Sequence, residues 1–137
     1  MGSPRPLTKK QVLDLLSKKA PLSGADLRGI DLSGVCFDGA DLRSTKMAEC
    51  NLSRATFRGT NLKAASLWRA ECSDTVFDGA NMEEADLDFT NLEGASFRGA
   101  KVKKTIFPYT RVPLDDVLDS VRTGRRIRMT GPDYDDE

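Results

Sequence analysis

The 137-residue sequence contains no histidine, which removes the commonest general base and a frequent metal ligand. Its 21 basic and 21 acidic residues cancel, so no net charge draws the chain toward nucleic acid or an anionic membrane. The three cysteines have unrelated spacings that match neither a zinc site nor a disulfide framework. No phosphate-binding glycine loop, nucleophile elbow, membrane-length apolar run or signal peptide is visible. These absences predict a soluble, cytoplasmic, non-enzymatic protein with no metal and no cofactor.

What the sequence does contain is an unbroken five-residue period from Ala20 to Tyr109. The centre of each unit is apolar, and the residue two positions earlier is small or β-branched. Such a two-residue alternation is typical of a strand, and a turn after each unit makes the chain coil. The units VCFDG, ATFRG, TVFDG and ASFRG recur every twenty residues, which indicates one coil per twenty residues. Their rings are predicted to stack as a structural core column of Phe37, Phe57, Phe77 and Phe97.

The units ADLRG at 25–29, ADLRS at 40–44, TNLKA at 60–64 and ADLDF at 85–89 resemble the A(D/N)LXX units of pentapeptide-repeat proteins. Eighteen consecutive units carry this resemblance over about two thirds of the chain. It implies an all-β solenoid, a right-handed quadrilateral β-helix of about four and a half coils with one unit on each face. Within so narrow a coil, a small residue such as Ala55 has to sit beside each large centre.

The flanking segments are predicted to cap the two ends of the solenoid. Thr8 and Gln11 have the spacing of a capping box at the start of the first helix. The residues expected to face the coils are Val12, Leu13, Leu15 and Leu16 in this helix and Val117, Leu118 and Val121 in the second. The chain is thereby divided into an N-terminal segment with a capping helix, the β-helix, a C-terminal capping helix and a tail predicted to be partly disordered: residues 1–19, 20–112, 113–124 and 125–137.

The polar positions of the units predict contacts between coils. Charges of alternating sign follow the phenylalanines, which predicts a ladder of Asp38, Arg58, Asp78 and Arg98. Two further columns are expected to form hydrogen bonds from coil to coil in preference to binding a metal: Asp41, Asn61 and Asn81, and Asn51, Glu71 and Asn91. Cys50 and Cys72 fall at inward positions and are interpreted as core residues, whereas Cys36 points outward.

Three large rings, Trp68, Phe89 and Tyr109, occupy outward positions on one face of successive coils. We call them the aromatic patch. An exposed apolar patch is a usual mark of a contact surface. Three interpretations stay open: the C-terminal segment covers the patch, it forms a homodimer interface, or it binds another protein. A homodimer through the C-terminal end is a further possibility.

Eight acidic residues without an intervening base form a predicted acidic belt around one coil: Glu71, Asp74, Asp78, Glu83, Glu84, Asp86, Asp88 and Glu93. Some members of the resembled family mimic DNA and bind DNA gyrase or topoisomerase IV. The balanced charge, uninterrupted frame and short rod of this chain differ from that pattern. The leading hypothesis is therefore a non-catalytic structural or protein-interaction module with an unknown protein partner. Nucleic-acid contact through the basic residues 122–129 is a weaker alternative, because the acidic residues 133–137 offset that charge.

Overall fold

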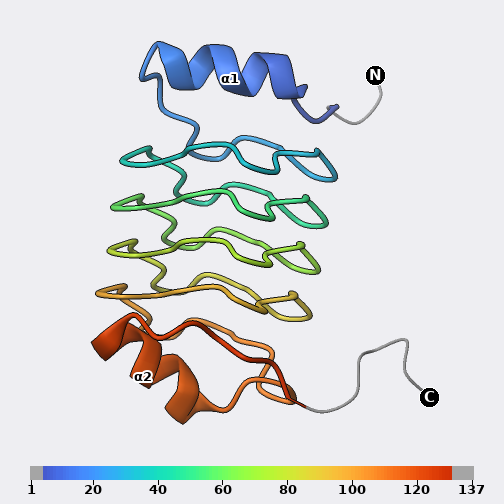
Figure 1. Cartoon of the computed structure of the whole chain (residues 1–137). Helices are drawn as coiled ribbons and strands as arrows, with labels where there is room; N and C mark the ends of the chain where they lie inside the picture. Colours follow the sequence, from blue (N-terminus) through green and yellow to red (C-terminus); the bar gives the residue numbers. More distant parts are fainter. Residues whose placement is uncertain (1–4, 131–137) are drawn as a thin grey trace, which may run out of the picture.

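Each five-residue unit makes one parallel bridge to the neighbouring coil and then turns. In the computed structural model, which describes residues 5–130, every bridge joins residues twenty positions apart, from Asp26–Lys46 to Asp86–Ile106. Four units therefore make one coil, and the coils stack between two terminal helices (Figure 1). Within residues 5–130 the bridges are isolated and no longer strand forms, because a turn follows each bridge after only two residues.

The backbone of each inner coil is hydrogen-bonded to the coil before it and the coil after it. The Phe57 N–H donates to the Val76 carbonyl at 2.7 Å, and the Thr56 N–H donates to the Val35 carbonyl at 3.1 Å. This pattern repeats along the stack, so peptide groups of neighbouring coils pair with each other although the bridges are isolated.

The last residue of every unit from Gly24 to Lys104 adopts a left-handed backbone conformation. Gly39 has a φ of 73°, as expected for a glycine corner, but Arg54 at 60° and Glu84 at 63° adopt the same conformation. The geometry of the turn therefore requires a positive φ at all four corners, including those at which a side chain makes it costly.

Where an aspartate or asparagine precedes the unit centre, its side chain supports the following turn. The side-chain oxygen of Asn61 accepts a hydrogen bond from the Lys63 N–H at 3.1 Å, and Asn81 does the same for Glu83 at 3.0 Å. The prediction that these columns bond mainly from coil to coil was wrong, because a short Asx side chain reaches the N–H two residues ahead more easily. Within these columns of the described chain, only Asn91 and Glu71 form a side-chain bond between coils, with Asn91 donating to Glu71 at 3.3 Å.

The interior is a continuous apolar column. Every unit centre from Leu22 to Phe97 is at most 2% exposed. The predicted phenylalanine column is present, with ring centroids of neighbouring coils 4.8, 5.2 and 5.0 Å apart and ring planes within 9° of parallel. Ala55 is completely buried beside this column, as the narrow coil requires. Where threonine takes the small position its hydroxyl stays paired: Thr60 donates to the Phe37 carbonyl at 2.8 Å.

The helix α1, Lys9–Ser17, covers the N-terminal end (Figure 1). The predicted capping box is present, since Thr8 and Gln11 each bond the other's backbone N–H. Val12 is fully buried, and Leu16 packs partly buried against the same core. The expectation that Leu13 faces the coils was wrong: it is 43% exposed, because it lies about 100° around the helix from Val12.

The helix α2, Leu114–Thr123, lies at the other end and stops at Gly124, whose φ is 80°. Val117 is buried as predicted, but Leu118 is 45% exposed and its predicted inward position was wrong. In its place Ser120 is fully buried, and its hydroxyl accepts a hydrogen bond from the Phe97 N–H at 3.0 Å. The helix thus supplies an acceptor to an N–H at the end of the stack that has no further coil to bond.

Residues 125–130, which we call the C-terminal strap, run back along the last coil. Ile127 is 1% exposed; its N–H donates to the Ala95 carbonyl at 2.7 Å, and its carbonyl accepts from the Gly94 N–H at 2.8 Å. The strap therefore pairs with the last coil and covers its core. The predicted disordered segment after Thr130 lies outside the described residues.

Candidate protein-interaction surface

The aromatic patch lies on one face of three consecutive coils. The exposed fractions are 38% for Trp68, 47% for Phe89 and 50% for Tyr109. Ile106, which was not predicted from the sequence, adds a fourth apolar side chain to this face at 47% exposure. It occupies the outward bridging position, directly after Asp86 in the column. An isoleucine at a position that is otherwise polar on this face was the signal that could have identified it.

The rings of the patch are fixed by neighbouring side chains. Trp68 and Phe89 meet edge to face, with centroids 6.1 Å apart and planes at 79°. Tyr109 packs against the buried Phe107 at 6.0 Å, and its hydroxyl donates to the Thr105 carbonyl at 3.3 Å. Partial burial raises the pKa of Tyr109 above its usual value. These rings are held in defined positions, which lowers the entropy lost when another chain packs against them.

A cation lies within the patch. The Arg69 guanidinium carbon is 4.9 Å from the centroid of the Trp68 ring and 6.0 Å from that of Phe89. Among residues 5–130, Arg69 makes no ion pair. The patch therefore combines apolar rings with a positive charge that no described carboxylate neutralises.

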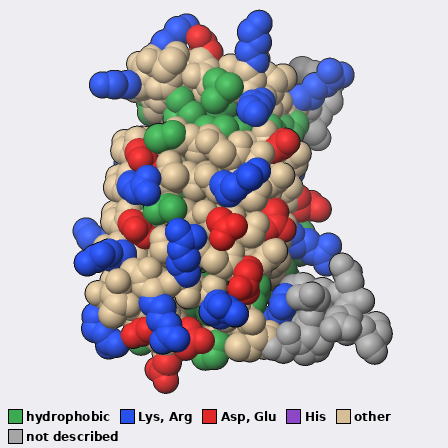
Figure 2. Space-filling model, in the orientation of Figure 1, with side chains coloured by type: hydrophobic (Ala, Val, Ile, Leu, Met, Phe, Trp, Pro, Cys, Tyr) green, Lys and Arg blue, Asp and Glu red, His purple; other side chains and the backbone are tan. Residues whose placement is uncertain are grey.

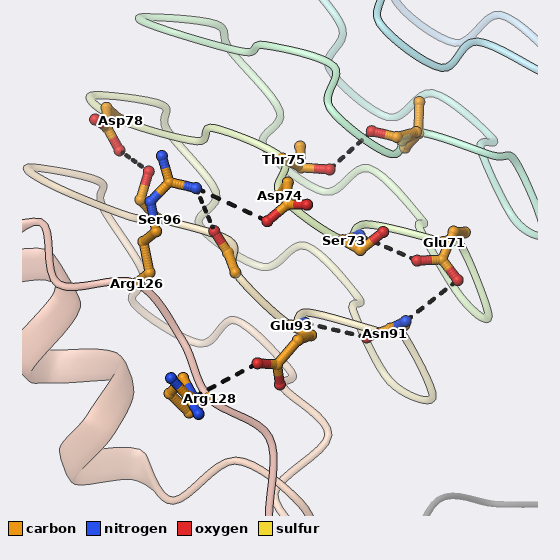
Figure 3. A network of polar contacts seen from close by, with 12 residues as sticks. Glu71, Ser73, Asp74, Thr75, Asp78, Asn91, Glu93, Ser96, Arg126 and Arg128 are labelled. Carbon is orange, nitrogen blue, oxygen red and sulfur yellow. Dashed lines mark hydrogen bonds and ion pairs between the residues drawn. The ribbon is translucent and has the colours of Figure 1, made fainter.

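The acidic belt and the basic C-terminal residues, which lie far apart in the sequence, meet in the structure (Figure 3). Arg126 Nη1 lies 3.8 Å from Asp74 Oδ1, and Arg128 Nε lies 3.6 Å from Glu93 Oε2. Glu93 also accepts a hydrogen bond from the Met129 N–H at 2.9 Å. Two carboxylates of the belt thus lie against the C-terminal strap.

The remaining charges of the surface are mixed. Figure 2 shows acidic and basic side chains interspersed over the visible face, with hydrophobic side chains gathered below α1. Glu83 and Glu84 of the belt share an open pocket with Lys63, Lys103 and Lys104. The predicted charge ladder beside the phenylalanine column is present in part, since Arg58 lies 3.7 Å from Asp38. No single sign of charge dominates these regions.

Two cysteines are buried and one is exposed, as predicted from the sequence. Cys50 is buried, donates to the Leu27 carbonyl at 2.8 Å, and has its pKa raised to about 11 by burial. Burial also raises the pKa of Cys72. Cys36 is exposed and lines a groove between the end of α1 and the first coil, together with Leu16 and Pro21.

Among residues 5–130, no group of three histidine, cysteine or carboxylate side chains is arranged to hold a metal ion. Neither of the two helices in that range has the length and apolar character needed to cross a membrane.

Comparisons with known proteins agree with this architecture. A family model described as pentapeptide repeats matches in eight copies, over residues 20–47, 36–68 and 70–107. A pentapeptide repeat protein from Nostoc PCC 7120 is 28% identical, with a TM-score of 0.76 over 86% of this chain and 97% of that chain. This extensive likeness indicates a right-handed β-helical solenoid.

Two other solved structures are similar over less of their length or with a looser fit. A pentapeptide repeat protein from the thylakoid lumen of Arabidopsis thaliana is 30% identical, with a TM-score of 0.47 over 58% of this chain and 59% of that chain. A pentapeptide repeat protein from the cyanobacterium Cyanothece 51142 is 28% identical, with a TM-score of 0.34 over 78% of this chain and 67% of that chain. A comparison with curated proteins gave no match.

Proposed function

Because the chain belongs to the pentapeptide-repeat family, we propose that it is a non-catalytic protein-interaction module that binds a partner through its aromatic patch. The quadrilateral coil predicted from the sequence serves in this proposal as a rigid scaffold, on which each outward residue has a fixed neighbour one coil away. The observation that carries the proposal is the exposure of Trp68, Phe89 and Tyr109, with Ile106, on one face.

The aromatic patch is too small to form a specific interface by itself. Covering the exposed parts of the three rings removes roughly 300 Å² of apolar surface from water, worth roughly 7 kcal/mol before the cost of association. A specific interface buries about 800 Å² on each partner. The patch therefore acts as the apolar centre of an interface whose partner also contacts the surrounding polar side chains. This arithmetic favours a partner with a complementary polar rim over a homodimer held by the rings alone.

The test is a triple substitution of the patch, Trp68→Ser, Phe89→Ser and Tyr109→Ser. Proteins that co-purify with the wild-type chain from its own cells, identified by mass spectrometry, are expected to be lost from the triple variant. A matched control, Leu13→Ser with Leu118→Ser, removes two exposed apolar side chains at the ends of the rod and should retain them. Circular dichroism checks that both variants keep the fold. Retention of every partner by the triple variant would refute the proposal.

The DNA-mimic alternative has less support from the described charges. A mimic of duplex DNA requires acidic groups along the rod, whereas Asp74 and Glu93 of the acidic belt already pair with Arg126 and Arg128. A supercoiling assay with purified DNA gyrase and a decatenation assay with topoisomerase IV decide the matter. Inhibition or protection from a quinolone at low protein concentration would favour the mimic over the aromatic interface.

Nucleic-acid contact through residues 122–129 is tested in the same preparation. Binding through arginines predicts a gel shift of DNA or RNA that weakens steeply as salt increases. The pairing of Arg126 and Arg128 with carboxylates of the same chain argues against it. We therefore expect no shift at physiological salt.

A further inference from the structure

The path of the C-terminal strap brings the end of the described chain next to the aromatic patch. The Thr130 N–H donates to the Arg111 carbonyl at 2.7 Å, and Arg111 Nε donates back to the Thr130 carbonyl at 3.1 Å. Arg111 follows Tyr109 of the patch by two residues. Thr130, after which residues 131–137 follow in the sequence, is therefore fixed at the edge of the patch.

The length of chain beyond that point suits the span of the patch. Seven residues follow Thr130, and an extended chain of that length reaches about 23 Å. The patch extends over two steps between coils, from the coil of Tyr109 to that of Trp68, which is about 10 Å at the spacing of neighbouring strands. The segment is thus long enough to span the whole patch.

The chemistry of the segment also matches that of the patch. The sequence of residues 131–137 is GPDYDDE, with four carboxylate side chains and one tyrosine. The patch supplies rings for the tyrosine to pack against, and Arg69 supplies a cation without a described carboxylate partner. An aromatic pair typically contributes about 0.5–1.5 kcal/mol beyond the area it buries. Opposite charges at an interface add specificity and orientation.

We propose that residues 131–137 of the same chain occupy the aromatic patch and compete with the partner for it. This inference rests on the proposed function, because competition requires that the patch be a binding surface. The segment then acts as a built-in competitor, and the partner is a protein that presents an acidic, tyrosine-containing extended segment of the same chemistry. Because residues 131–137 are tethered to the patch, their effective concentration there is high. A partner displaces them only when it binds the patch tightly enough to overcome that effective concentration.

The test uses the 137-residue chain and its single tryptophan, Trp68, as the reporter. Acrylamide quenching and the emission maximum are recorded for the wild type, for Tyr134→Ser and for a matched control, Tyr134→Phe. We expect a higher quenching constant and a longer emission wavelength in Tyr134→Ser, because the ring that covers the patch is lost. Tyr134→Phe retains the ring and should behave as the wild type. Light scattering at the same concentrations establishes whether the chain is monomeric.

A peptide added in trans separates the tail proposal from the proposed function. The peptide GPDYDDE should restore protection of Trp68 in the Tyr134→Ser variant and leave the wild type unchanged, and high salt should weaken its binding. Equal quenching in all three proteins would overturn occupation by the tail while leaving the partner experiment unaffected. If dilution removes both the protection of Trp68 and an oligomer seen by light scattering, the segment that covers the patch comes from a second copy. That outcome would overturn the intramolecular contact. Failure of the proposed function is recognised separately, by retention of partners in the triple patch variant.

Discussion

The phenylalanine column offers a direct measurement of what ring stacking contributes to this solenoid. Phe77 stacks on both sides, at 5.2 Å from Phe57 and 5.0 Å from Phe97, whereas Phe37 stacks only on Phe57, at 4.8 Å. Both rings are completely buried. Leucine is the residue at most other unit centres of the coil, so Phe→Leu keeps an apolar side chain of a kind that this backbone accommodates.

The two substitutions differ in the number of stacked pairs that they remove. Phe77→Leu removes two pairs and Phe37→Leu one, while the loss of ring volume is the same in both. With each pair contributing about 0.5–1.5 kcal/mol, Phe77→Leu should destabilise the chain by about that amount more than Phe37→Leu. For a chain of this size, 1 kcal/mol lowers the melting temperature by about 3–5 °C.

The assay is urea unfolding followed by circular dichroism, with the free energy of unfolding obtained by linear extrapolation. Met47→Leu, at the centre of another face, serves as a control for a volume-conserving change and should cost less than about 1.5 kcal/mol. Equal losses for Phe77→Leu and Phe37→Leu would refute the stacking argument, because burial alone would then account for the column. A change in the slope with urea would indicate that the coils no longer unfold together.

Four further outcomes follow from the described geometry. Gly39→Ala should cost about 1–2 kcal/mol in urea unfolding, because φ is 73° and no atom lies within 4 Å of an added Cβ, so that only the backbone is strained. Ala55→Leu should cost about 1–3 kcal/mol by overpacking the coil, and an unchanged melting temperature would contradict the packing argument. In the native protein a thiol reagent should modify Cys36 alone, with the two buried thiols reacting only after unfolding. The hydrogen bond from Arg28 lowers the pKa of Asp26 to about 2, so an NMR titration of the Arg28→Gln variant should find the pKa of Asp26 returned toward 3.8. Because the pKa of Asp26 is lower in the folded chain than in the unfolded chain, the pair stabilises the fold fully above the unfolded pKa. This stabilisation is lost as the pH falls toward 2.

Much of the solenoid was predictable because its contacts repeat with the sequence. A residue in one coil bridges the residue twenty positions later, so periodicity alone identifies neighbours such as Phe57 and Phe77. The ends do not repeat, and there the sequence was less informative. Whether Leu13 and Leu118 turn toward the coils depends on how each helix rotates against the stack, which no local pattern records.

The candidate site divides in the same way. The spacing of Trp68, Phe89 and Tyr109 placed them on one face, but their edge-to-face contact and the position of Arg69 depend on side-chain conformation. Ile106 was not predicted because the patch was inferred from aromatic residues and not from apolar ones at the bridging position.

The sequence by itself determined the coil, its four faces, the stacked rings and the face that carries the aromatic patch, because each depends on a fixed spacing of five or twenty residues. Only the tertiary structure decided that the C-terminal strap pairs with the last coil and that Arg126 and Arg128 meet Asp74 and Glu93. Those contacts join segments outside the repeat to segments within it. Their register is set by how α2 and Gly124 redirect the chain, which has no counterpart in the spacing of the sequence.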